Sequence, residues 1–154
     1  MAAAKKRLGN RHRGLTLGGL PKTQGYFGIG SHNGDRITFR DSSGRMQGSA
    51  TQSGSRTTPR DSLGRAVGSA DTFGNRTTVR DVSGRTIETA STNRDLTTFR
   101  SSNGSSLGSA SQSRNQTTFR DASGRSTGSA ANNGNRTTFR DSSGRSTGSA
   151  SKSR

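Results

Sequence analysis

Polar and apolar side chains alternate along short stretches of this chain, and the stretches return at a fixed spacing. Residues 36–40 read Arg-Ile-Thr-Phe-Arg, and similar stretches follow every 20 residues. Alternation with a period of two, together with many β-branched residues, is typical of strands that bury one face. The pattern predicts strands that place Ile37 and Phe39 on one face and the arginine and threonine side chains on the other.

The repeated unit of 20 residues occurs six times, over residues 31–150. Residues 151–154 begin a seventh unit that stops at once, and residues 1–30 do not follow the repeat. A fixed period of this kind is typical of arrays in which each module packs on its neighbours. The column that is always arginine contains Arg40, Arg60, Arg80, Arg100, Arg120 and Arg140.

An Asp-x-x-Gly motif follows the first strand in five of the six repeats. Aspartate favours the first position of a type I turn, where its carboxylate accepts the N–H groups of the turn. The glycine can adopt a positive φ and close the hairpin with a bulge. With a second, looser turn between repeats, each unit is predicted to contain two strands and two turns. The predicted structural turn residues are Asp41, Gly44, Asp61, Gly64, Asp81, Gly84, Gly104, Asp121, Gly124, Asp141 and Gly144.

The core is expected to be thin, because only 22% of the residues are hydrophobic. Burying one Phe contributes about 2 kcal/mol, so one repeat does not offset the entropy of ordering its own backbone. The array is therefore expected to need caps, and Tyr26, Phe27 and Ile29 are predicted to form the N-terminal one. Pro59 predicts a local irregularity in the second repeat. The column predicted to face inward on the second strand is Gln47, Val67, Ile87, Leu107, Thr127 and Thr147.

The repeat resembles two known classes. The run from Gly134 to Phe139, followed by glycines at 144 and 148, is similar to the choline- and glucan-binding cell-wall repeats, which stack β-hairpins into a solenoid. The aromatic residues that form the ligand cages of that family are absent, so choline binding is not implied. The Asp41-x-x-Gly44-Arg45 turn resembles the YD repeats of RHS shells, although Arg40 separates the aromatic residue from the aspartate. The Thr, Arg, Asp and Gly array also resembles short proteins of proteobacteria and their phages.

These observations predict an all-β, solenoid-like array of six β-hairpins. The organisation predicted is a basic, Gly-rich arm with a capping segment at 1–30, the six repeats at 31–150 and a C-terminal tail at 151–154. Low hydrophobicity with high net charge is also typical of disorder, which is the alternative for the same composition.

The net charge of +16 predicts attraction to polyanions. The arm has six basic residues and no acidic one, namely Lys5, Lys6, Arg7, Arg11, Arg13 and Lys22. Together with the arginine column they are the predicted contacts to a partner or a polyanion, because guanidinium groups bind phosphates and carboxylates in bidentate fashion. The alternative role for the arginine column is structural, with each arginine pairing with the neighbouring aspartates.

Catalysis, metal binding and cofactor binding are not expected. The two histidines, His12 and His32, lie in or beside the basic arm with no cluster of acidic residues around them, and the chain has no cysteine. We see no apolar secretion signal and no stretch that approaches the roughly 20 apolar residues of a membrane span. The expected location is a virion or the cytoplasm.

The expected function is that of a non-enzymatic structural or adaptor protein in a larger assembly of protein subunits, with a phage virion or surface appendage as the preferred setting. An accessory protein that binds DNA or RNA through the arm and the arginine columns is the alternative. A self-assembling fibre is the third.

Overall fold

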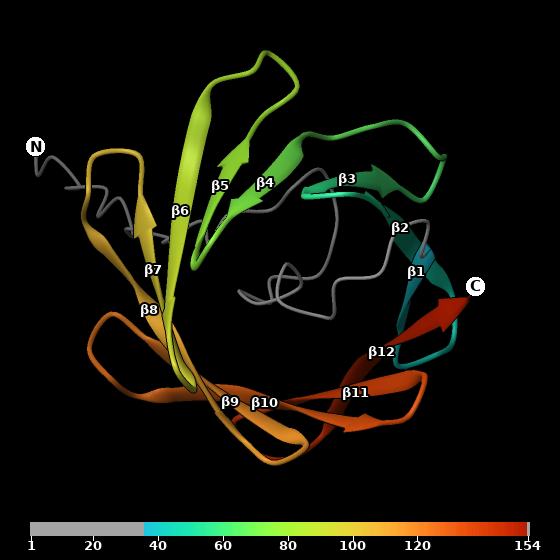
Figure 1. Ribbon diagram of the computed structural model, residues 1–154. Coiled ribbons are helices and arrows are strands. Elements are labelled where there is room, and N and C mark those ends of the chain that lie inside the picture. The colour runs from blue at the N-terminus through green and yellow to red at the C-terminus, as the bar shows by residue number, and fades with distance from the viewer. Residues whose placement is uncertain (1–35, 154) are drawn as a thin grey trace, which may run out of the picture.

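The computed structural model describes residues 36–153, which form twelve antiparallel strands joined by short turns (Figure 1). The two strands and two turns predicted for each repeat are confirmed, since the strands form six hairpin-like pairs. The strands are β1 (Arg36–Asp41), β2 (Met46–Ser53), β3 (Arg56–Asp61), β4 (Ser69–Phe73), β5 (Arg76–Arg80), β6 (Thr86–Asn93), β7 (Leu96–Ser101), β8 (Ser106–Ser113), β9 (Gln116–Asp121), β10 (Ser126–Asn133), β11 (Arg136–Asp141) and β12 (Ser146–Ser153).

The first and last strands pair with each other, so the sheet is a closed barrel (Figure 1). Along the β1–β12 seam, Arg36 lies opposite Ser153 and Asp41 lies opposite Gly148. The prediction of a solenoid-like array is therefore wrong. Because β1 of the first repeat pairs with β12 of the last repeat, neither strand has an unpaired edge that would need a separate cap. The predicted cap of Tyr26, Phe27 and Ile29 lies outside the described residues.

A stagger between successive repeats explains the closure. Arg36 faces Thr51 across β1–β2, and Thr51 faces Thr58 across β2–β3. The residue equivalent to Arg36 in the second repeat is Arg56, so Thr58 lies two positions beyond it. A stagger of this kind tilts the strands against a common axis, and together with the right-handed twist it curls a sheet until its edges meet. Local hairpin patterns are the same in a solenoid and in a barrel, which is why the repeat alone did not distinguish them.

The two faces of the first strand are as predicted. Ile37 and Phe39 are buried inside the barrel, with 8% and 1% of their surface exposed, while Arg36 and Arg40 are exposed. Four Phe side chains, from Phe39, Phe99, Phe119 and Phe139, form most of the core with the Ala column. That column contains Ala50, Ala70, Ala90, Ala110, Ala130 and Ala150.

The prediction for the second strand was wrong. The column that begins at Gln47 is only partly buried or is exposed, and Leu107 alone in it packs against the core. The bulge explains the difference. The register shifts between Phe39 and Arg40, so Phe39 pairs with Gly48 while Arg40 pairs with Met46. The extra residue moves the inward positions one place along, to the glycine and alanine columns.

Two glycines of the Gly48 column, Gly128 and Gly148, lie where two backbones approach closely. A Cβ atom added at Gly148 would lie 2.4 Å from the carbonyl oxygen of Arg40, and one added at Gly128 would lie 2.3 Å from that of Arg140. Backbone atoms cannot move aside as a flexible side chain can. At Gly128 and Gly148 the sheet geometry therefore leaves no room for a side chain.

The second repeat is locally irregular, as Pro59 predicted. β3 and β4 keep only two paired positions, Arg56 with Asp71 and Thr57 with Ala70. Beyond them the strands touch through an isolated bridge between Arg60 and Ala66 and one hydrogen bond from the Val67 N–H to the Pro59 carbonyl, at 3.0 Å. Proline has no N–H to donate to the ladder, so this is the most weakly paired seam of the barrel.

No helix was found among residues 36–153 that has the length and apolar character needed to cross a membrane.

Candidate functional site

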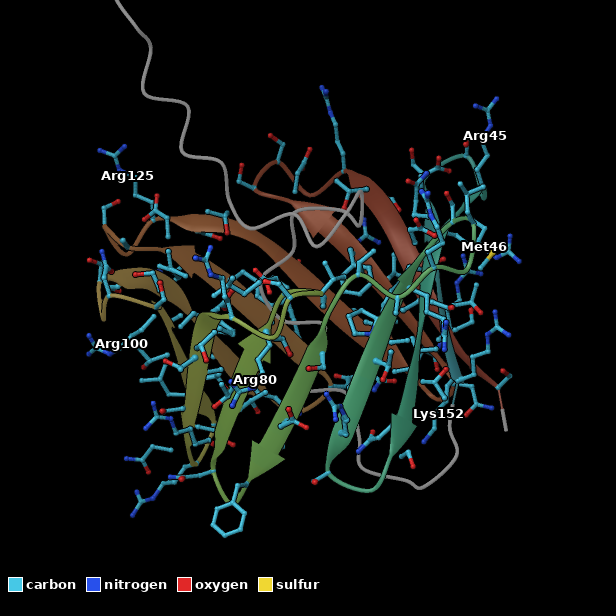
Figure 2. The ribbon with its side chains drawn as sticks, turned by 90° about the horizontal axis from the view of Figure 1, so that it is seen from above. Arg45, Met46, Arg80, Arg100, Arg125 and Lys152 are labelled. Atoms are coloured by element: carbon cyan, nitrogen blue, oxygen red, sulfur yellow. The ribbon has the colours of Figure 1, made fainter. Side chains whose placement is uncertain are left out.

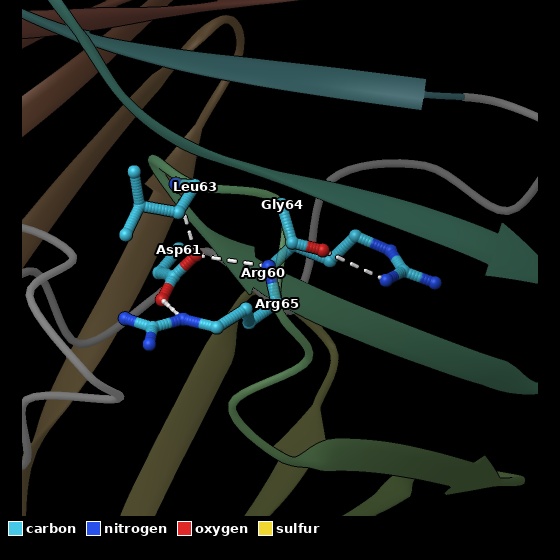
Figure 3. A network of polar contacts seen from close by, with 5 residues as sticks. All are labelled: Arg60, Asp61, Leu63, Gly64 and Arg65. Atoms are coloured by element: carbon cyan, nitrogen blue, oxygen red, sulfur yellow. Dashed lines mark hydrogen bonds and ion pairs between the residues drawn. The ribbon is translucent and has the colours of Figure 1, made fainter.

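The Asp-x-x-Gly-Arg turns all lie at one end of the barrel, where the first strand of each repeat ends. In the second repeat, the Asp61 carboxylate accepts hydrogen bonds from the backbone N–H groups of Leu63 and Arg65, both at 2.9 Å (Figure 3). The Arg65 side chain adds an ion pair to the same carboxylate, also at 2.9 Å. Gly64 has a φ of 81°, which a side chain would strain. The turn is thus held by its own aspartate.

The arginine column braces these turns. Arg40 donates from Nη1 to the carbonyl oxygen of Gly44 at 2.8 Å, and four other repeats have the same bond at 2.8–3.0 Å. Arg80 differs, because it donates to the Thr86 hydroxyl at 3.1 Å and lies 3.9 Å from Asp71. The main bond of the column is therefore to a turn carbonyl rather than to the neighbouring aspartate. One N–H group of each guanidinium is used, and a guanidinium has five.

A second arginine column, from the turns themselves, lies at the same end. We call both columns together the arginine rim. Arg45, Arg100 and Arg125 point away from the barrel in Figure 2, and all rim residues are exposed except Arg80, which is half-buried. The rim consists of Arg40, Arg60, Arg80, Arg100, Arg120 and Arg140 on the strands and Arg45, Arg65, Arg85, Arg125 and Arg145 in the turns.

Four of the turn aspartates beside the arginine rim have a lowered pKa, namely Asp41, Asp61, Asp81 and Asp121. A hydrogen bond from the Ser43 hydroxyl is the main cause that lowers the pKa of Asp41, and the equivalent serines do the same for Asp81 and Asp121. For Asp61 the backbone N–H of Arg65 is the main cause of the lowered pKa. These carboxylates face their own turns. The groups that face solvent on the rim are therefore guanidinium groups, which bind phosphate or carboxylate ligands well.

The opposite end of the barrel opens into a cavity of about 440 Å³. Phe99, Phe119 and Phe139 lie along it with four alanines of the Ala column. The rest of the lining consists of Ile37, hydroxyl and amide side chains of Thr, Asn and Gln residues, and a few charged side chains such as Asp95 and Lys152. Arg94 lies at the mouth with a φ of 53°, a conformation that the equivalent glycines of other repeats adopt without strain. The cavity therefore combines apolar and polar walls.

Glu88 is a buried carboxylate in the Gly48 column. It pairs with Val79, so the third repeat has Glu and Val where the first repeat has Gly48 and Phe39. Only 8% of Glu88 is exposed, and within residues 36–153 no hydrogen bond or ion pair engages its carboxylate. Burial raises the pKa of Glu88 to about 7. The smaller Val79 leaves room for the longer side chain opposite.

The structure brings the predicted arginine column and the turn aspartates and glycines together in one rim. The predicted arm contacts from Lys5 to Lys22 lie outside the described residues, as do both histidines. Sequence reasoning missed the turn arginines, the cavity and Glu88. A signal for Glu88 existed, because Gly-Ser-Ala becomes Glu-Thr-Ala in the same repeat in which Phe becomes Val79.

Residues 36–153 contain no cluster of three or more His, Cys, Asp or Glu side chains that could hold a metal ion. No protein-family model, no curated protein and no solved structure matches this chain.

Proposed function

We propose that this chain is a non-enzymatic structural or adaptor element of a larger assembly. The supporting observation is the repetition of the same outward groups on six hairpins around one closed barrel. A partner surface that fits one hairpin fits the next, so weak contacts reinforce one another. Six similar hairpins around one axis also suit a partner that is itself a symmetric ring. A virion or surface appendage of a phage is the setting we favour.

The test is whether the chain belongs to a particle at a fixed copy number. An affinity-tagged chain, expressed in the organism that encodes it, is expected to co-purify with one discrete large particle. The ratio of the tagged chain to the other subunits of that particle is expected to be constant. Cross-linking and mass spectrometry are expected to map the contacts to outward residues such as Thr38 and Ser151, which lie opposite each other on β1 and β12. Recovery of the chain only as a free monomer, at every concentration tested, contradicts the proposal.

A second function, polyanion binding, is supported by the arginine rim. Residues 36–153 have eighteen basic and eight acidic side chains, a net charge of +10. The rim concentrates eleven of the arginines at one end, ten of them exposed. DNA or RNA is the polyanion proposed, with the basic arm as an additional contact.

For this second function we expect binding to a DNA duplex that weakens steeply with salt. Replacing Arg45, Arg65, Arg85, Arg125 and Arg145 with glutamine is expected to reduce the slope of log K against log salt by about 4.5, at about 0.9 per lost phosphate contact. The matched control replaces five exposed arginines at the opposite end, Arg36, Arg56, Arg76, Arg114 and Arg136. Fluorescence anisotropy at several salt concentrations measures both. An equal loss in the two variants contradicts a role for the rim, and no complex at low salt contradicts the function.

A further inference from the structure

The cavity has a mouth, and the chain enters the barrel there. Arg36 is the first residue of β1 and lies opposite Ser153. The next pair, Ile37 and Lys152, lines the cavity on both sides of the seam. Arg36, the first described residue, therefore lies at the open end and not at the arginine rim.

The walls of the cavity suit an inserted segment of polypeptide. Phe99, Phe119 and Phe139 offer aromatic surface to apolar side chains. The wall also contains hydroxyl and amide groups such as those of Thr97 and Gln112. Thr97 shares a hydrogen bond with Thr92, and Gln112 donates to the Arg114 carbonyl oxygen, but a hydroxyl and an amide each have capacity for further hydrogen bonds. A backbone that enters a barrel must find partners for its N–H and C=O groups, and this wall supplies them.

A matching segment lies a short distance along the chain. Residues 24–30 read Gln-Gly-Tyr-Phe-Gly-Ile-Gly, and the five residues 31–35 connect them to Arg36. Five extended residues reach about 17 Å, which is enough for the chain to turn back into the mouth. The alternate glycines favour tight turns in a confined space. A tethered segment also competes at an effective concentration of about a millimolar or more against any free ligand.

We propose that residues 24–30 dock in the lumen of the barrel, with Tyr26, Phe27 and Ile29 packed against the Phe rings of the core. The occupant is thus a segment of this chain rather than a separate molecule. The proposal does not depend on the proposed functions, because it concerns the inner face and they concern the outer one.

The first test uses the full-length chain and a single fluorophore. The chain has no tryptophan and one tyrosine, so Tyr26→Trp gives a unique signal at the docked position. We expect a blue-shifted emission and protection from acrylamide. Adding Ala110→Phe, which fills the cavity, is expected to shift the emission to that of solvent-exposed tryptophan. Ser111→Phe, next along β8 and on the outer face, is the matched control and is expected to leave the emission blue-shifted.

The second test uses disulfide formation, which is clean because the chain has no cysteine. Phe27→Cys with Ala110→Cys is expected to cross-link at least about tenfold faster than Phe27→Cys with Ser111→Cys, because docking raises the effective concentration of the inner pair. Cooperative thermal unfolding verifies that each variant folds. Equal cross-linking rates, or a solvent-like emission of Trp at position 26 in the unfilled barrel, overturn the proposal. Binding of an added apolar dye in the cavity of the unaltered chain also overturns it.

Discussion

The barrel is expected to lose stability as the pH rises from about 4.5 to above 7, and Glu88→Gln is expected to remove that loss. The pKa of Glu88 is raised from 4.5 to about 7 by burial. Folding therefore favours the protonated carboxyl. Below the unfolded pKa both states hold the proton and Glu88 costs nothing. Above the folded pKa both states are ionised, and the folded state holds a buried charge at a cost of about 3 kcal/mol.

Urea denaturation at a series of pH values measures this effect. The Glu88→Gln variant is expected to show a nearly constant free energy of unfolding from pH 5 to 8, about the range in which the unaltered barrel declines. His12 and His32 are present in both chains, so their titration cancels in the comparison. The aspartates with a lowered pKa act in the opposite direction and at lower pH, where stability is lost as they become protonated. Parallel curves for the two chains would contradict a buried Glu88.

A double variant serves as the control if glutamine itself disturbs the core. Val79→Phe together with Glu88→Gly restores the Phe and Gly pair of the other repeats. Val79→Phe alone forces a large ring against Glu88, and such overpacking costs about 1–3 kcal/mol. The double variant is therefore expected to be more stable than the sum of the single changes, with a coupling of about 0.5–3 kcal/mol. It is also expected to lack the decline above pH 5.

Gly148→Ala is expected to destabilise the barrel by about 3 kcal/mol, because its Cβ would lie 2.4 Å from the Arg40 carbonyl oxygen on the neighbouring strand. Gly128→Ala meets the same contact at 2.3 Å, inside the β10–β11 pair. The first change lies on the seam that closes the barrel and the second does not. Equal losses in the two variants are therefore the result expected of a closed barrel. Thermal and urea denaturation measure both.

Gly144→Ala is the control for the effect of a methyl group on glycine. Nothing lies within 4 Å of a Cβ at this position, although its φ of 82° is strained for alanine. The expected loss is about 1 kcal/mol. If Gly148→Ala costs no more than Gly144→Ala while Gly128→Ala remains severe, the β1–β12 seam is open in solution.

Strands and faces could be predicted because they are local properties of the sequence. Phe39 and its equivalents alternate with polar residues, and that alternation fixes which side is buried. The inward column of the second strand could not be derived in this way, because one bulge beside Arg40 moves every later side chain to the other face. Closure of the barrel could not be predicted either, because it depends on a stagger of two residues between repeats and not on the sequence of any single repeat.

The candidate sites follow the same division. The arginine column is visible in the sequence as an invariant position, and its place on the rim follows from the turn beside it. The cavity is not visible, because its lining comes from threonines, alanines and amides that are ordinary strand residues in every repeat. Glu88 could be predicted only in part. One substitution breaks the glycine column, but only the pairing with Val79 shows that the carboxylate is buried.

Closure makes the number of repeats a structural constant. A solenoid that gains or loses a unit becomes longer or shorter and keeps its cross-section. In a closed barrel the diameter grows with the number of strands, so a seventh hairpin would widen the lumen and draw the Phe rings apart. Duplication or loss of one repeat, which is easy in a gene of this kind, would therefore produce a barrel with a different interior. Six repeats are the size at which these small side chains and four Phe rings form one core.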